Sequence, residues 1–216
     1  MTRGIMRVGA SVRRPASASS EFVAALLALF EQRGFGGAPR YLGRDGDADL
    51  FGYIPGEVPS RFQVWDDAQI AAAGRLLRSM HDATRGSALV GHRPVVCHHD
   101  AGPNDAVFQV GLPVAWIDFD TAAPGDPLED VGYAAWTWCI SSKKTQSVER
   151  QAAQVRLLAD AYGLDTSGPQ RMLLGRDPVV QSDTRRRRHD RGRIAWSLRE
   201  AAFTAEHREA FEAALT

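Results

Sequence analysis

One segment of the chain, residues 94–133, constrains the fold more than any other part of the sequence. Its sequence, PVVCHHDAGPNDAVFQVGLPVAWIDFDTAAPGDPLEDVGY, alternates short apolar runs with clusters of Gly, Pro, Asp and Asn. Apolar runs of this length with such punctuation predict strands joined by tight turns, followed by the start of a helix. Each polar cluster is therefore expected at the end of a strand.

Two carboxylates in this segment have a spacing that suits phosphoryl transfer to a hydroxyl group. Asp100 ends an H-x-D sequence with His98, and Asp118 follows in the next predicted hairpin. Phosphoryl transfer needs one carboxylate to accept or orient the hydroxyl proton, and oxygen ligands that hold Mg²⁺ against the nucleotide phosphates. A loop followed by a hairpin would bring the second carboxylate back beside the first.

The order of these motifs resembles that of the aminoglycoside phosphotransferase and choline kinase family, a branch of the protein-kinase-like superfamily. The pattern of that family is H-x-D-x-x-x-x-N, then an apolar residue and Asp, then G-D-P-x-x-D. This chain has His98-His99-Asp100, Ile117-Asp118 and Gly125-Asp126-Pro127-Leu128-Glu129-Asp130. The resemblance implies an α+β, two-lobed kinase-like fold, with a reduced β-rich N-terminal lobe at residues 1–55 and a mostly helical lobe at residues 56–216.

The resemblance also implies an activity and its cofactors. A phosphotransferase of this kind moves the γ-phosphate of ATP or GTP to an alcohol group of a small molecule, with Mg²⁺ bridging the phosphates. Asp100 would be the catalytic base and Asp118 a metal ligand. The family has an asparagine at the position of Asp105, which follows Asn104 here. Either Asp105 binds the metal, or a shift of one residue brings Asn104 to it.

Other polar residues of the segment are expected to support this site. His98 is expected to hold the loop by a hydrogen bond, because a histidine base is not needed beside Asp100. Asp120 either helps to hold metal or caps a turn. Asp126 and Asp130 are expected at the start of a helix, where negative charge suits the helix dipole. The His-His-Asp cluster could instead bind zinc, but no further histidine or cysteine follows at ligand spacing.

The N-terminal part lacks two features of a kinase, the G-x-G-x-x-G loop and the phosphate-binding lysine. Arg13 and Arg14 resemble the V-R-R-P stretch of some family members, in which an arginine would replace that lysine. A guanidinium group binds phosphate with two hydrogen bonds. Alternatively, both arginines are solvated charges at a strand end. A helix is expected at residues 21–33. Its Glu31, or the competitor Glu21, could pair with an arginine of the preceding strand, or each is a plain surface glutamate.

A turn at Ile54-Pro55-Gly56 follows the second of two strands, which are expected at residues 39–44 and 49–54. The resemblance places the hinge between the lobes here, so Tyr53 and Ile54 are expected to contact the nucleotide base through their backbone. A Pro-Gly pair also forms turns without such a role. Further helices are expected at residues 66–84, 128–140, 147–162 and 194–215.

The composition argues against several other classes of protein. Lys+Arg and Asp+Glu number 26 each, so no overall charge favours nucleic acid or a membrane surface. The sequence contains neither a long apolar run nor a signal peptide, and we expect a cytoplasmic protein. Cys97 and Cys139 are expected to be buried thiols. The arginine-rich run at residues 185–193 is expected to be a solvated face, so nucleic acid is not an expected partner.

Two other functions remain open from the sequence. The missing glycine-rich loop, the missing lysine and Asp105 would also fit a catalytically degenerate relative, which binds a nucleotide or a partner without transferring phosphate. The arginine run could also serve a nucleic-acid-binding module. The motifs do not name the acceptor, so aminoglycosides, choline-like alcohols, sugars, macrolides and homoserine are all candidates. The chain is expected to be a monomer or a homodimer.

Overall fold

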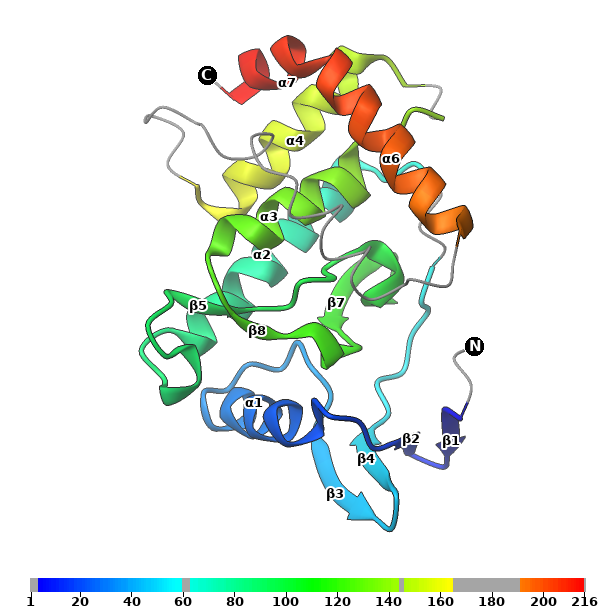
Figure 1. Ribbon diagram of the computed structural model, residues 1–216, viewed down its shortest axis with the longest axis vertical. Coiled ribbons are helices and arrows are strands. Elements are labelled where there is room, and N and C mark those ends of the chain that lie inside the picture. The colour runs from blue at the N-terminus through cyan, green and yellow to red at the C-terminus, as the bar shows by residue number, and fades with distance from the viewer. Residues whose placement is uncertain (1–3, 60–62, 144–145, 165–190, 216) are drawn as a thin grey trace.

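The computed structural model describes residues 4–59, 63–143, 146–164 and 191–215. Its N-terminal part is a four-stranded antiparallel sheet in the order β1-β2-β4-β3, with helix α1 beside it (Figure 1). The elements of this part are β1 (Met6–Val8), β2 (Ser11–Pro15), α1 (Ser20–Gln32), β3 (Tyr41–Asp45) and β4 (Ala48–Gly52). The two predicted strands and the predicted helix are therefore present as β3, β4 and α1, with their ends shifted by one or two residues.

The rest of the described chain is mostly helical and lies above the sheet in Figure 1. Two two-stranded sheets, β5-β8 and β6-β7, lie between the four-stranded sheet and the helices. The helices are α2 (Asp67–Thr84), α3 (Pro127–Ala134), α4 (Val148–Tyr162), α6 (Arg191–Glu206) and α7 (Arg208–Leu215). The strands are β5 (Val95–Cys97), β6 (Ala106–Gln109), β7 (Leu112–Trp116) and β8 (Ala123–Gly125).

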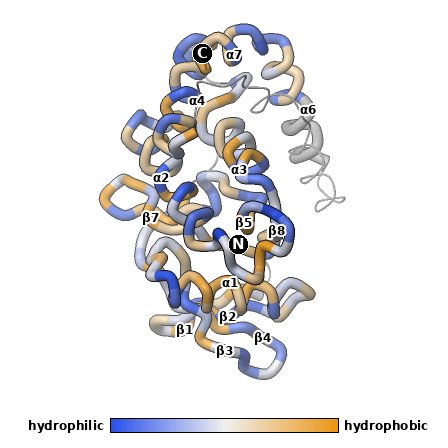
Figure 2. The backbone as a smooth tube through the Cα atoms, turned by 90° about the vertical axis from the view of Figure 1, so that its left-hand side faces the viewer, coloured by the Kyte–Doolittle hydropathy of each residue, from blue (hydrophilic) through white to orange (hydrophobic). Residues whose placement is uncertain are grey.

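Helix α2 forms where the sequence supplies both a cap and an apolar face. The Asp66 side chain accepts a hydrogen bond from the Gln69 backbone, and the Gln69 side chain accepts one from the Asp66 backbone, which completes a capping box. Ile70, Leu77 and Met80 are fully buried at helical spacing. Apolar and polar stretches alternate along α2 and α4 in Figure 2, as amphipathic helices require.

Aromatic side chains join the β6-β7 hairpin to the helices. The Trp65 ring lies 5.4 Å from the Phe108 ring and 5.2 Å from the Trp138 ring, measured between centroids. Trp116 and Trp138 are completely buried. The indole nitrogen of Trp138 also donates to the carbonyl oxygen of Ala101, at 3.1 Å. This contact fixes the loop after β5 to the helical core.

Three elements differ from the sequence-based predictions. The helix predicted at residues 128–140 is an α-helix only as far as Ala134 and continues as a π-helix at Ala135–Cys139. The helix predicted at residues 194–215 is interrupted at His207, which separates α6 from α7. Strand β8 was not predicted, because three residues that include Pro124 carry no alternation to recognise. It exists because β5 offers it an antiparallel partner.

Within the described ranges, no helix combines the length and the apolar content that crossing a bilayer would require. Both cysteines are buried thiols, as predicted. The division at residue 55 stays a prediction, and the arginine-rich run at residues 185–193 lies largely outside the described residues.

The crossing of α2 and α4 gives a test of this packing. Gly74 faces α4, and a Cβ atom there would lie 2.8 Å from the carbonyl oxygen of Leu158. Gly74→Ala should therefore lower the free energy of unfolding by about 1–3 kcal/mol, although alanine favours a helix more than glycine does. Urea unfolding measures this change. Ser79→Ala, on the exposed side of the same helix, is the control and should stay within about 0.5 kcal/mol.

Candidate active site

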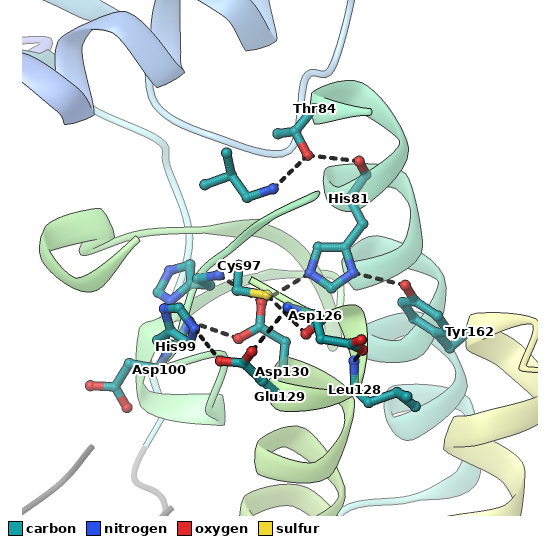
Figure 3. A network of polar contacts seen from close by, with 12 residues as sticks. His81, Thr84, Cys97, His99, Asp100, Asp126, Leu128, Glu129, Asp130 and Tyr162 are labelled. Carbon is teal, nitrogen blue, oxygen red and sulfur yellow. Dashed lines mark hydrogen bonds and ion pairs between the residues drawn. The ribbon is translucent and has the colours of Figure 1, made fainter. Parts of the chain in front are cut away.

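The loop that follows β5 is held by one buried carboxylate. Asp130, in the first turn of α3, accepts hydrogen bonds from the backbone nitrogens of His98 and His99, at 2.6 and 2.7 Å. The side chain of Asp130 is fully buried, and Nε2 of His81 on α2 lies 3.0 Å from it (Figure 3). Three segments that are distant in the sequence therefore meet at Asp130.

His81 continues this network to α4. Its Nδ1 atom lies 2.8 Å from the hydroxyl oxygen of Tyr162. Burial raises the pKa of Tyr162 to about 12, so the hydroxyl group stays protonated near neutral pH. At the end of α2, Thr84 accepts a hydrogen bond from the backbone nitrogen of Val96 on β5, at 3.0 Å. The start of the loop is thus fixed by the helical core.

The structure places His98 inside the protein, between the loop and the β6-β7 hairpin. Its Nε2 atom donates to the carbonyl oxygen of Ile117 at 3.0 Å, and its Nδ1 atom accepts from the backbone nitrogen of Asp100 at 3.2 Å. Burial lowers the pKa of His98, which favours the neutral ring that this pattern requires. The ring thereby connects the residue before Asp118 to Asp100.

Asp100 lies at the edge of this network, half-buried. The hydroxyl group of Tyr133 on α3 donates to its Oδ1 atom. In Figure 3 the carboxylate of Asp100 points away from His81 and Tyr162. This hydrogen bond orients the carboxylate of Asp100 at the margin of the core.

Asn104 and Asp105, the two alternatives for the second metal ligand, contact each other. Nδ2 of Asn104 donates to Oδ2 of Asp105 at 2.9 Å. The backbone carbonyl of Asp105 accepts from the backbone nitrogen of Ile117 at 2.8 Å, so Asp105 lies beside the residue that precedes Asp118. Asp105 is only 8% exposed. The structure therefore brings Asp105 and the start of the Asp118 turn together.

Asp118 adopts the left-handed backbone conformation, with φ 64° and ψ 59°, which is uncommon for any residue other than glycine. Its Oδ1 atom lies 2.9 Å from Nη1 of Arg14, which comes from β2 of the four-stranded sheet. Nη2 of the same arginine contacts Asp120. A cation of the N-terminal sheet therefore reaches the predicted metal ligand.

Arg13 does not share this position. Adjacent residues of a strand point to opposite faces, and Arg13 pairs with Asp47 of the β3-β4 turn at 3.1 Å. Glu31 pairs with Arg40 at 2.7 Å, so the arginine that it contacts is neither Arg13 nor Arg14.

Tyr53, one of the two residues predicted to contact the nucleotide base, already has partners within the protein. The backbone nitrogen of Tyr53 donates to the carbonyl oxygen of Ala10 at 2.9 Å, which connects the hinge to the β1-β2 hairpin. The guanidinium group of Arg7 lies 3.7 Å from the centre of the Tyr53 ring. Ile54 is half-buried in the adjoining turn.

The geometry opposes a zinc site in the His-His-Asp cluster. Both ring nitrogens of His98 are hydrogen-bonded within the protein, and those of His99 lie 3.1 Å from the Thr121 carbonyl oxygen and 2.9 Å from the Glu129 carboxylate. The buried side chains of His81, Cys97 and Asp130 also converge, with ligand atoms within 4.8 Å of one another.

The ligand atoms of this second cluster also have hydrogen-bond partners within the protein. Both ring nitrogens of His81 have partners, and the Cys97 thiol donates to the carbonyl oxygen of Asp126 at 3.1 Å. Burial raises the pKa of Cys97, which keeps the thiol protonated and makes it a poor metal ligand. We therefore describe the cluster as a hydrogen-bonded part of the core.

Sequence reasoning did not assign Tyr133 and Thr121 to this site, and it did not name the partners of His81, which was expected only to pack or to form hydrogen bonds. The hydroxyl group of Thr121 donates to the carbonyl oxygen of His98 at 2.6 Å. None of these residues has a local signal, because each acts on a partner more than 20 positions away. Asp126 behaves differently: it caps α3 in a capping box with Glu129, and that pattern is local.

The segment that carries these motifs also matches a known protein family. The sequence model of the Phosphotransferase enzyme family matches residues 84–174, which contain Asp100, Asp118 and Asp130. The resemblance seen in the motifs is confirmed. A curated relative, the trifolitoxin immunity protein of Rhizobium leguminosarum bv. trifolii, is 28% identical over 98% of this chain and 94% of its own length.

Solved structures resemble the whole described architecture. An aminoglycoside phosphotransferase from Alicyclobacillus acidocaldarius matches with a TM-score of 0.61 and 13% identity, covering 99% of this chain and 91% of its own. A choline/ethanolamine kinase family protein from Mesorhizobium loti matches with a TM-score of 0.60 and 15% identity, covering 98% and 88%. The predicted α+β kinase-like fold is therefore confirmed.

Asp130 provides a test of the network that holds the loop. Burial alone would raise the pKa of Asp130, but the hydrogen bond from His81 and the charges of nearby histidines outweigh it and lower the pKa. A lowered pKa in the folded state gives stability that is present above the unfolded value of about 3.9 and is lost as the pH falls through the folded value.

Asp130→Asn should therefore lower the free energy of unfolding at pH 7 by about 3 kcal/mol, since it breaks a buried charged network. The variant should also lose less stability than the wild type between about pH 5 and pH 2. Urea unfolding at several pH values measures both effects. The control is Asp82→Asn, in an exposed ion pair on α2, which should cost less than about 1 kcal/mol. Equal losses for the two variants would contradict the role of Asp130.

Proposed function

We propose that this chain is a Mg²⁺-dependent phosphotransferase that moves the γ-phosphate of ATP or GTP to a hydroxyl group of a small molecule. The observation that supports it most is the contact of Arg14, from the four-stranded sheet, with Asp118 at the end of the β6-β7 hairpin. A cation beside a metal-binding carboxylate is suited to the phosphates of a metal–nucleotide complex. The match to the Phosphotransferase enzyme family supports the same reaction class.

The donor set fits magnesium. Asp105 and Asp118 offer carboxylate oxygens, the hard ligands that Mg²⁺ prefers. These two aspartates would hold the ion. When bound, Mg²⁺ would bridge the phosphates and neutralise the charge that develops on them.

The reaction places three demands on the side chains of this chain. Asp100 accepts the proton of the acceptor hydroxyl as that oxygen forms its bond to the γ-phosphorus and the bond to the β-γ bridging oxygen breaks. Tyr133 holds one oxygen of Asp100 by a hydrogen bond, which keeps the carboxylate oriented. Arg14 supplies positive charge to the phosphates, with Arg13 and the Tyr53–Ile54 backbone as further predicted nucleotide contacts.

The acceptor is a small hydroxyl compound whose identity the fold does not fix. Solved relatives include a macrolide 2'-phosphotransferase from Brachybacterium faecium and a gentamicin complex of an aminoglycoside phosphotransferase. The same architecture thus serves acceptors of different shapes. A cytoplasmic location and a monomeric or homodimeric state remain predictions.

A second candidate function is nucleotide or partner binding without transfer. Asp105 replaces the asparagine of the family motif and adds negative charge near Asp118. The Tyr53 backbone donor is engaged by Ala10, which removes one expected contact with the base. The relative named as an immunity protein would be compatible with protection by binding as well as by modification.

Two variants test the leading function. Asp100→Asn should lower kcat by about 10²–10⁴-fold, because the proton acceptor is lost, while the affinity for the nucleotide changes little. ADP release with a panel of hydroxyl acceptors measures kcat, and isothermal titration measures nucleotide binding.

Asp118→Asn tests the metal ligand. In the wild type, ATP should raise Tm only when Mg²⁺ is present, and Asp118→Asn should abolish this Mg²⁺-dependent rise. Asp82→Asn, in an exposed ion pair on α2, serves as the control for both.

The same measurements separate the two functions. Stabilisation by ATP and Mg²⁺ without ADP release for any acceptor would favour the binding protein. The absence of both effects in the wild-type chain would contradict the phosphotransferase and also nucleotide binding, and would leave only the binding of a partner.

A further inference from the structure

Arg14, the cation proposed to bind phosphate, has its ion-pair partners outside the N-terminal sheet. A glutamate of helix α1 could have paired with an arginine near it, but Glu31 contacts Arg40, which precedes β3. Arg14 contacts two carboxylates of the turn that follows β7, Asp118 and Asp120.

The two nitrogens of the Arg14 guanidinium group divide between these two aspartates. Nη1 donates to Oδ1 of Asp118 at 2.9 Å, and Nη2 donates to Oδ1 of Asp120. The Arg14 side chain is 14% exposed, whereas those of Asp118 and Asp120 are 50% and 41% exposed. The arginine is thus the buried member of the cluster, and it depends on both carboxylates for its hydrogen bonds.

Asp120 has a further contact that Asp118 does not share. Its Oδ1 atom also accepts a hydrogen bond from the hydroxyl group of Ser19 at 3.1 Å. Ser19 immediately precedes helix α1. Asp120 therefore holds together strand β2, the start of α1 and the turn that carries Asp118.

A metal ion at Asp118 changes this balance of charge. A divalent cation and a guanidinium group compete for the same carboxylate oxygen and repel each other. Arg14 would then lose its contact with Asp118 and would keep the one with Asp120. We propose that Asp120 is the positioning residue of Arg14, which orients the guanidinium group toward the phosphates whether or not Asp118 holds a metal ion.

This inference rests on the proposed function, and it competes with a simpler role for Asp120 as a direct metal ligand. The two roles predict opposite effects when no metal is present. A metal ligand only adds negative charge, so its removal should leave phosphate binding unchanged or strengthen it. An anchor of Arg14 should weaken phosphate binding when it is removed, because the guanidinium group loses its orientation.

The experiment measures ADP binding in EDTA by isothermal titration. Asp120→Asn, which changes the shape of the side chain little, should weaken binding by about fivefold. Ser19→Ala should weaken it in the same direction by a smaller factor. In an Arg14→Gln background, which itself weakens binding, Asp120→Asn should have no further effect.

The matched control is Asp82→Asn. Asp82 pairs with Arg78 and Arg85 on the exposed side of α2, and the change removes the same charge from an ion-paired carboxylate that lies outside the proposed site. Its ADP affinity should stay within about twofold of the wild type, in line with a weak exposed pair. Circular dichroism and thermal unfolding verify that each variant is folded.

The outcomes separate this inference from the proposed function. Wild-type chain that binds ADP, together with Asp120→Asn that binds it equally well or better, would overturn the anchoring role and leave the phosphotransferase proposal intact. An equal loss for Asp120→Asn in the wild-type and Arg14→Gln backgrounds would also overturn it. A wild-type chain that binds no ADP, with or without Mg²⁺, would overturn both proposals.

Discussion

A single buried carboxylate, Asp130, supports the arrangement on which the site depends. Its oxygens accept hydrogen bonds from the backbone of His98 and His99 and from the ring of His81. A buried charge is tolerated only when its hydrogen bonds are satisfied, so helix, loop and strand must all be in place before the carboxylate is stable. The loop that carries Asp100 is therefore tied to the helical core by the same buried hydrogen bonds.

The second constraint crosses from the sheet to the helices. Arg14 connects strand β2 with the turn at Asp118 and Asp120, far along the chain. The N-terminal sheet is small, and within the described residues this arginine provides a polar contact between that sheet and the turn after β7. The orientation of the sheet relative to that turn therefore depends in part on this side chain.

Much of the site was predictable because its signals are local. The H-x-D sequence, the apolar residue before Asp118 and the capping pattern at Asp126 depend on residues that are close in the sequence. The roles of His81 and Tyr133 were not predictable in the same way, since a histidine or tyrosine on a helix face gives no indication of its partner. The choice between Arg13 and Arg14 also needed the sheet, because strand geometry sends neighbouring side chains to opposite faces.

The sequence by itself determined where most helices and strands form, which carboxylates follow the strands and which family the motifs resemble. Periodicity, caps and turn residues act over a few positions, so they are visible without coordinates. Only the tertiary structure decided that Arg14 pairs with Asp118 and Asp120, and that Glu31 pairs elsewhere. Those contacts depend on how the sheet lies against the helices, and long-range packing of that kind leaves no mark in the spacing of residues along the chain.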